Sequence, residues 1–401
     1  MSGGIGLALA GGGPEGAIYE IGALRALDEA IDGLDLNDLT VYVGVSAGGF
    51  IAANLANRLT TAQMCRAIVK TDPGEHPFIP ETFLQPAVKE ILQRGGRVPR
   101  LLLESIREAL SHPGDPGVAD AMLRLSRALP ISIFDNEPIR AYLERIYSIK
   151  GRTDDFRRLR RPLFVVGSDL EAGRAVRFGE PGLDHVPISR AVQASTALPG
   201  LYPPVEIDGH YYVDGVLLKT LHASVALDHG AKLLFCINPI VPVDLRPGDD
   251  GAPPGFLLDR GLPSVLSQTF RTLIRSRLQA GLDAYGTRYR NAQVVLFEPP
   301  RDDYRMFFTN IFTFSSRRAV CEHAYEVTRL QLRARREDLE PILARHGLSF
   351  APGVLEEPNR SLWRGVGMDD EAREIGHEHT LDRLGRSLDR LEALLDRQGP
   401  G

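Results

Sequence analysis

Residues 40–48 read TVYVGVSAG and place a serine where a strand-like run gives way to a helical pattern. The run before Ser46 is rich in β-branched residues, which favour strands, and residues 47–59 follow a helical pattern. Gly44 and Gly48 flank the serine in the arrangement Gly-x-Ser-x-Gly and let the chain turn sharply without a Cβ clash. The stretch therefore predicts a nucleophile elbow, with the serine hydroxyl at the carboxyl end of a strand. A strand-to-helix turn with Ser46 as a simple helix cap is the alternative.

A second strand-to-helix turn lies earlier in the chain. Residues 5–10, IGLALA, predict a short buried strand, and residues 11–16, GGGPEG, follow directly and open a helix that extends to about Ile31. The order strand, glycine loop, helix, strand, serine turn, helix is typical of a parallel sheet with helices on its faces. The amides of Gly11, Gly12 and Gly13 can approach a ligand closely, as an oxyanion hole requires.

The same glycine loop also fits a dinucleotide-binding fingerprint, through Gly11, Gly13 and Gly16. That function requires an acidic residue at the end of the next strand. Here the next strand ends in Val45-Ser46, which argues against a nicotinamide-dependent oxidoreductase.

An aspartate leaves a predicted hairpin late in the same region. Residues 205–207 and 211–213 flank the turn Asp208-Gly209-His210, which is a hairpin signal, and Asp214-Gly215 follows. The Asp214 carboxylate can point into a cleft from there, although a turn or helix cap is the commoner fate of Asp-Gly. His222 follows closely enough to suggest a Ser-His-Asp triad, but Ser46 comes after only the second strand, earlier than such hydrolases place their nucleophile.

Composition limits the function classes. The 401 residues are 43% hydrophobic and 25% charged with a net charge of −5, which gives no support to a nucleic-acid partner. Three widely spaced cysteines form neither a disulfide framework nor a metal-ligand pattern. No apolar stretch reaches the length of a transmembrane helix, and no signal peptide is recognisable. We expect a cytoplasmic protein or one that is peripheral to a membrane.

The rest of the chain predicts further organisation. Prolines interrupt residues 60–135, which we interpret as a helical insertion, possibly a lid, within a domain of residues 1–240. Residues 241–401 are predicted to form a mainly helical region that ends in an amphipathic helix. Amphipathic patterns at 99–111 and 262–285 either belong to the core, touch a membrane or line an acyl pocket. Further helices are expected at 138–149, 188–194, 327–344 and 381–395, and further strands at 163–167, 175–178, 233–237 and 294–297.

These motifs together resemble the patatin-like phospholipase family over about residues 5–240. The matching pieces are GGGPEG at 11–16, GVSAG at 44–48, Asp214-Gly215, Ser168-Asp169 and the approach ASTALP at 194–199. Two positions depart from the family pattern. Glu15 stands where the family usually has a basic residue, which puts lipid-phosphate binding at that position in doubt, and Val216 stands where a small residue is usual.

The resemblance implies a three-layer α/β/α fold with a mainly parallel central sheet. It also implies a lipid acyl hydrolase that uses a Ser–Asp dyad of Ser46 and Asp214. Gly11, Gly12 and Gly13 would form the oxyanion hole, and Gly16, Gly44, Gly48 and Gly215 would support the motifs. The implied substrates are phospholipids, lysophospholipids or acylglycerols at a membrane or micelle surface, with no metal or organic cofactor. A non-catalytic lipid-binding or scaffold protein on the same fold is the alternative.

Overall fold

The structure is a computed structural model. It describes residues 4–69, 85–87, 131–244, 256–259, 261–301, 314–358 and 360–368. The predicted helices at 99–111 and 381–395 lie outside these ranges, as does most of the predicted insertion.

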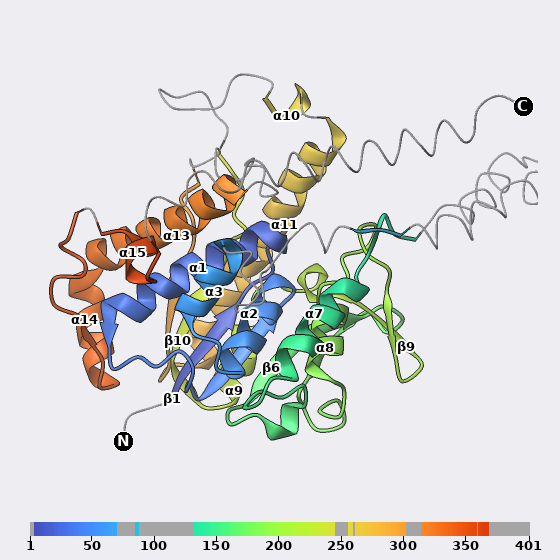
Figure 1. The fold of residues 1–401 in the computed structure, drawn as a ribbon, viewed down its shortest axis with the longest axis horizontal. Coiled ribbons are helices and arrows are strands. Elements are labelled where there is room, and N and C mark those ends of the chain that lie inside the picture. The colour runs from blue at the N-terminus through green and yellow to red at the C-terminus, as the bar shows by residue number, and fades with distance from the viewer. Residues whose placement is uncertain are drawn as a thin grey trace, which may run out of the picture.

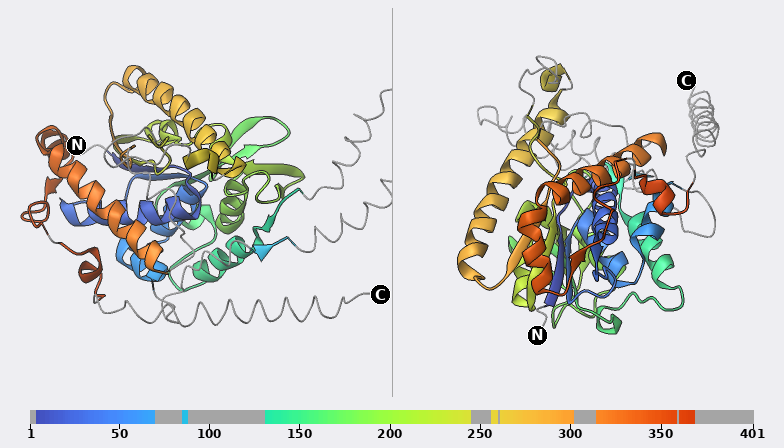
Figure 2. Two further views of the ribbon diagram at one scale, coloured as in Figure 1. Left: turned by 90° about the horizontal axis from the view of Figure 1, so that it is seen from above. Right: turned by 90° about the vertical axis from the view of Figure 1, so that its left-hand side faces the viewer.

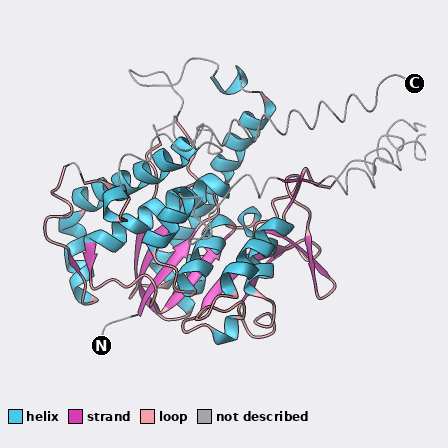
Figure 3. Ribbon diagram, in the orientation of Figure 1, coloured by secondary structure: helices cyan, strands magenta, loops and turns pink. Residues whose placement is uncertain are grey.

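A mixed sheet of eight strands forms the centre of the protein (Figures 1 and 3). Its strands β11, β10, β1, β3 and β6 run parallel to their neighbours in that order. Every residue of β3 is buried, as expected for a parallel strand covered on both faces. The bounds are β1 (Gly4–Leu9), β3 (Val41–Val45), β6 (Leu163–Asp169), β10 (Ala231–Ile237) and β11 (Gln293–Phe297).

The other three strands are antiparallel and carry the predicted hairpins. They are β7 (Arg174–Phe178), β8 (Val205–Ile207) and β9 (His210–Asp214). Both β7 and β9 pair with β6, and β8 pairs with β9. The register sets Asp214 opposite Gly167. This pairing brings the end of β9 back to the middle of the sheet, next to the carboxyl end of β3.

Helices cover both faces of the sheet (Figure 2), and alternate residues of β1 belong to different core clusters. Leu7 and Leu9 of β1 belong to a core cluster with the helices of one face, whereas Ala8 belongs to a second cluster with those of the other. Three layers result, which confirms the predicted α/β/α fold. The first face carries α1 (Gly13–Ala30), α2 (Ala47–Ala56), α3 (Thr61–Val69), α7 (Glu137–Tyr147), α8 (Ile188–Ser195) and α13 (Phe314–Ala334). The second carries α9 (Ala223–Asp228) and α11 (Leu262–Arg288).

The region after residue 240 shares the core of the earlier region. Strand β11 extends the sheet, and α13 packs closely along α1, where a Cβ atom on Gly22 would lie 2.1 Å from the Cys321 carbonyl oxygen. Likewise α3 falls within the predicted insertion, yet its Met64 is buried in the core. The division at residue 240 and the insertion at 60–135 stay predictions.

One predicted helix is wrong in its bounds. Residues 327–344 are not a single helix: α13 ends at Ala334 and α14 (Arg336–Arg345) follows. Arg335 leaves the helical conformation with φ −104° and ψ 14°, and its guanidinium donates to the Leu296 carbonyl at 2.9 Å. Side-chain spacing alone carries no sign of this interruption.

The remaining described elements are short. They are β2 (Ile31–Asp32), β4 (Gln85–Pro86), β5 (Phe134–Asp135), β12 (Ser349–Phe350), α10 (Phe256–Asp259), α15 (Leu362–Gly365) and the 3₁₀ turns η2 (Phe156–Arg158) and η3 (Gly215–Leu217). Within the described ranges, no helix combines the length and the hydropathy that a membrane span needs.

Candidate active site

Ser46 occupies a strained turn between β3 and α2. Its backbone has φ 53° and ψ −123°, a conformation that costs a residue with a Cβ of order 1–3 kcal/mol and is typical of functional sites. A Cβ on Gly44 would lie 2.3 Å from the Gly48 carbonyl oxygen, and a Cβ on Gly48 would lie 2.5 Å from the Ala10 carbonyl oxygen. Both flanking positions therefore have room for glycine only, as an elbow of this kind requires.

The structure brings Ser46 and Asp214 into direct contact across 168 positions of the chain. The Ser46 hydroxyl donates to Asp214 Oδ2 at 2.7 Å. The other carboxylate oxygen, Oδ1, accepts from the Val216 amide at 2.9 Å. Both side chains are buried. The carboxylate is thus fixed by one backbone donor and aims its second oxygen at the serine hydroxyl.

The backbone of Asp214 is held as firmly as its side chain. Its amide donates to the Ala197 carbonyl at 3.0 Å. Its carbonyl accepts from the Ser168 hydroxyl at 3.1 Å. Ser168 lies on β6, so the aspartate is anchored to the central sheet rather than carried on a free loop.

Burial raises the pKa of Asp214 to about 7, against the lowering effect of the Val216 amide and the Ser46 hydroxyl. A general base works best when its pKa lies near the operating pH. Asp214 is therefore a much stronger base than an exposed aspartate, although close to neutral pH only part of it is ionised.

Ser195, at the end of α8, is a site residue that the motif reading did not single out. The Ser46 amide donates to Ser195 Oγ at 2.7 Å, and Ser195 Oγ donates to the Val166 carbonyl at 2.6 Å. Ser195 is fully buried and so joins α8, the elbow and β6 through one hydroxyl. The only sequence signal was its place in the segment ASTALP.

The glycine loop lies against the elbow. A Cβ on Gly11 would lie 3.2 Å from the Ser46 Cβ, and Gly13 has a positive φ of 62°. Within the part of the chain that the structure describes, the amides of Gly11, Gly12 and Gly13 have no backbone acceptor. They open helix α1, whose N-terminal end favours negative charge. This arrangement suits an oxyanion.

Glu15, the departure noted in the sequence, lies in the first turn of α1. Burial raises its pKa to about 7, and the positive charge of Arg271 on α11 lowers it in part. Both effects reduce the electrostatic repulsion between Glu15 and an anion near the glycine loop, because the carboxyl is partly protonated and the Arg271 cation lies nearby. Val216 packs against the loop: its Cγ2 would lie 3.3 Å from a Cβ on Gly11.

Histidine does not join this arrangement. Burial lowers the pKa of His222 to about 3, and its Nε2 is buried without a hydrogen bond. None of the hydrogen bonds of Ser46 or Asp214 in the described ranges involves a histidine. Those ranges also contain no cluster of His, Cys, Asp or Glu side chains suited to a metal ion.

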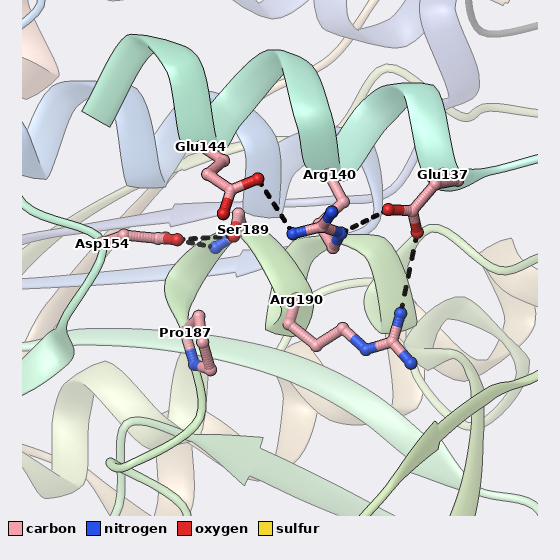
Figure 4. Close-up of a pocket in the computed structure, with 7 residues that line it drawn as sticks. All are labelled: Glu137, Arg140, Glu144, Asp154, Pro187, Ser189 and Arg190. Atoms are coloured by element: carbon pink, nitrogen blue, oxygen red, sulfur yellow. Dashed lines mark hydrogen bonds and ion pairs between the residues drawn. The ribbon is translucent and has the colours of Figure 1, made fainter. Parts of the chain in front are cut away.

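A separate surface cavity of about 300 Å³ lies between α7 and α8 (Figure 4). Its charged side chains are engaged with one another: Arg140 bonds to Glu137 and Glu144, and Asp154 accepts from the Ser189 amide and hydroxyl, both at 2.6 Å. Two contacts join α7 to α8, the helix that carries Ser195: Gln193 Nε2 donates to Glu137 Oε2 at 3.1 Å, and Arg190 forms an ion pair with Glu137 at 3.9 Å.

Comparison with known proteins gives a family match for this chain. The family model for patatin-like phospholipases matches residues 7–227, which include both Ser46 and Asp214.

Solved structures give more distant matches. VipD from Legionella pneumophila matches with 16% identity and a TM-score of 0.38, over 83% of this chain and 67% of VipD. The type III effector ExoU matches with 14% identity and a TM-score of 0.28, over 84% of this chain and 64% of ExoU. ExoU of Pseudomonas aeruginosa in its complex with SpcU matches with 16% identity and a TM-score of 0.27, over 71% of this chain and 52% of that protein. The chain thus spans half to two thirds of these longer proteins, and likeness this remote carries no argument about function.

Proposed function

This chain belongs to the patatin-like phospholipase family, and from that premise we propose that it hydrolyses fatty-acyl esters with a dyad of Ser46 and Asp214. The family implies a lipid acyl hydrolase in general. The observation that supports the dyad is the 2.7 Å hydrogen bond from the Ser46 hydroxyl to Asp214 Oδ2. The positive φ of Ser46 supports the same assignment. So does the glycine loop beside it, whose amides have no backbone acceptor among the described residues.

In the proposed first step, Ser46 Oγ attacks the ester carbonyl carbon while its proton passes to Asp214 Oδ2. The carbonyl oxygen becomes an oxyanion, which accepts hydrogen bonds from amides of the Gly11–Gly13 loop. The tetrahedral intermediate then collapses: the bond to the alcohol oxygen breaks, and the alcohol leaves with the proton from Asp214. An acyl ester of Ser46 remains.

In the second step, water attacks that acyl ester and gives its proton to Asp214. The bond to Ser46 Oγ breaks, the serine recovers the proton, and the fatty acid is released. Asp214 thus acts as base and acid in turn, without a histidine or a metal. Its raised pKa of about 7 suits both roles, because neither protonation state is strongly disfavoured near neutral pH.

We propose phospholipids, lysophospholipids or acylglycerols as the substrate class. The burial of the dyad favours an uncharged ester group in the reacting position. Position 15 holds glutamate rather than a basic residue that would bind lipid phosphate, so we propose no preference among these three lipid types.

The test is hydrolysis of a soluble short-chain ester by the wild type and by Ser46→Ala, Asp214→Asn and, as a matched control, Ser148→Ala. Ser148 is exposed and its hydroxyl donates to the Arg145 carbonyl of the adjoining helix α7 at 2.7 Å, so its loss should leave the rate unchanged. Loss of either dyad residue should lower kcat/KM by at least about 10³-fold. Equal rates for the wild type and Ser46→Ala would show that the dyad is wrong, and lipid binding without ester hydrolysis would favour the scaffold alternative.

A further inference from the structure

Helix α11 has a stripe of apolar residues that are exposed in the part of the chain that the structure describes. Leu278 and Tyr285 of this helix are buried in the second core cluster. Leu266, Phe270 and Leu273 are instead 45%, 54% and 55% exposed. Their spacing of four and three residues sets them on one face of the helix. The amphipathic pattern at 262–285, interpreted from the sequence as core, membrane contact or acyl pocket, thus divides into a buried half and an exposed half.

The exposed half lies at the edge of the sheet that carries the dyad. Gln268 Nε2 donates to the Val243 carbonyl at 2.6 Å, which fixes this part of α11 beside the chain that leaves the carboxyl end of β10. Strands β10, β1 and β3 are parallel, so their carboxyl ends share one edge of the sheet. In Figures 1 and 2, α10 and the start of α11 project beyond that edge, and Leu258 of α10 is 75% exposed.

The stripe also reaches the loop of Asp214. Arg277, one turn beyond Leu273 on the same face, donates to the Leu217 carbonyl at 2.7 Å. Leu217 is an exposed apolar residue three positions after Asp214 in the chain. Arg277 thus links the apolar stripe of α11 to the turn that follows Asp214, the proposed base.

Charge on α11 matches a particular partner. Residues 262–282 contain three arginines and no acidic residue. Arg275 is paired with Glu298 and Arg271 interacts with Glu15, so Arg277 carries the positive charge of the exposed face. Arg277 is exposed, and its hydrogen bonds go to the neutral carbonyls of Leu217 and Leu218, which leaves its positive charge at the surface. An apolar helix face bordered by arginine is the composition that binds the surface of an anionic bilayer. A second copy of the same face would bring like charges together, which disfavours association.

We propose that Leu258, Leu266, Phe270 and Leu273, with Leu217, form a docking surface for a bilayer that contains anionic phospholipid. Docking there would set the sheet edge with Ser46 against the lipid head groups. The inference deepens the proposed function and rests on it for its purpose. Binding itself, however, can be measured without hydrolysis.

The test is sedimentation of the full chain with vesicles of phosphatidylglycerol and phosphatidylcholine, in the Ser46→Ala background so that the lipid stays intact. We expect the double variant Phe270→Ser/Leu273→Ser to bind at least about 30-fold more weakly, because two half-exposed apolar side chains lose their burial in the bilayer. The matched control is Leu330→Ser on α13, an apolar residue 63% exposed on another face, which should bind like the parent. Pure phosphatidylcholine or high salt should also weaken binding.

Three results would overturn the docking surface. Unchanged binding by the folded double variant would do so, as would an equal loss in Leu330→Ser. A wild-type dimer that the double variant converts to monomers, without any vesicle binding, would assign the stripe to a second copy of the chain. Failure of the proposed hydrolase shows separately, as an absence of ester cleavage in a protein that still binds vesicles. For an active protein, the double variant should lose at least about 10-fold more rate on vesicles than on a soluble ester.

Discussion

Replacing Ser195 by alanine should destabilise the protein and slow the enzyme, although Ser195 does not touch the reacting atoms. Its hydroxyl accepts from the Ser46 amide at 2.7 Å and donates to the Val166 carbonyl at 2.6 Å. The variant leaves two backbone groups without this partner at a position that is fully buried. The Ser46 amide loses the hydrogen bond that holds it in a strained conformation.

The size of the effect follows from these two contacts. A buried donor or acceptor left unsatisfied costs about 1–3 kcal/mol. The space left by one hydroxyl is smaller than a water molecule needs, so water cannot restore the bonds. We expect Ser195→Ala to lower the free energy of unfolding by about 2–4 kcal/mol. If the elbow loosens, a misplaced Ser46 hydroxyl should lower kcat by about 10- to 100-fold, with a smaller change in KM.

Chemical denaturation and ester hydrolysis measure both effects, and Thr196→Val is the matched control. Thr196 Oγ1 bonds to carbonyls of its own helix at 3.0 and 3.1 Å, and the Val192 carbonyl keeps the Thr196 amide as a donor. The control should therefore change stability by less than about 1 kcal/mol. A Ser195→Ala protein as stable and as active as Thr196→Val would refute the positioning role.

Three further predictions concern acid–base chemistry and packing. If Asp214 is the base, kcat/KM should rise about tenfold per pH unit below its pKa of about 7 and level off above it; a flat profile from about pH 5 to about pH 9 would contradict this. Burial raises the pKa of Glu20 well above its ordinary value of 4.5. The protonated side chain therefore makes its full contribution to the free energy of unfolding when the pH is below the ordinary pKa, and this contribution is lost as the pH rises toward the raised pKa of the folded state. Glu20→Gln should therefore stabilise the protein more at about pH 8 than at about pH 5, by roughly 1.4 kcal/mol for each unit crossed, whereas an equal change at both values would show that Glu20 is ionised in the fold. Gly22→Ala should lower the free energy of unfolding by at least about 2 kcal/mol, because its Cβ would lie 2.1 Å from the Cys321 carbonyl oxygen. Gly286→Ala on α11, whose Cβ would have nothing within 4 Å, should raise it by about 0.5–1 kcal/mol. Thermal melts of the two variants compare these effects.

Much of the fold could be predicted because the strands carry local signals. The buried runs at β1, β3, β6 and β10 are short and apolar, and glycine or proline lies near their ends, so their existence and order follow from the sequence. Their pairing was less accessible. Nothing local shows that β9 pairs with β6 rather than with a later strand, and it is this antiparallel pairing that returns Asp214 to the centre of the sheet.

The candidate site divides in the same way. Ser46 and its glycines are recognisable because a sharp turn restricts which residues fit, as the contact distances at Gly44 and Gly48 show. Ser195 was not recognisable as a partner of Ser46, because a serine in a helix has many uses and the contact spans 149 positions. The exposed half of α11 was equally hidden, since an amphipathic pattern does not state which of its apolar residues meet the core.

Covalent labelling with a fluorophosphonate, followed by mapping of the modified residue, tests the proposed dyad most directly. We predict that the wild type is modified at Ser46 alone, that Ser46→Ala is not modified, and that Asp214→Asn reacts at least about 10²-fold more slowly because the hydroxyl has lost its base. Modification of a different serine, or labelling of Asp214→Asn at the wild-type rate, would contradict the pairing of these two residues.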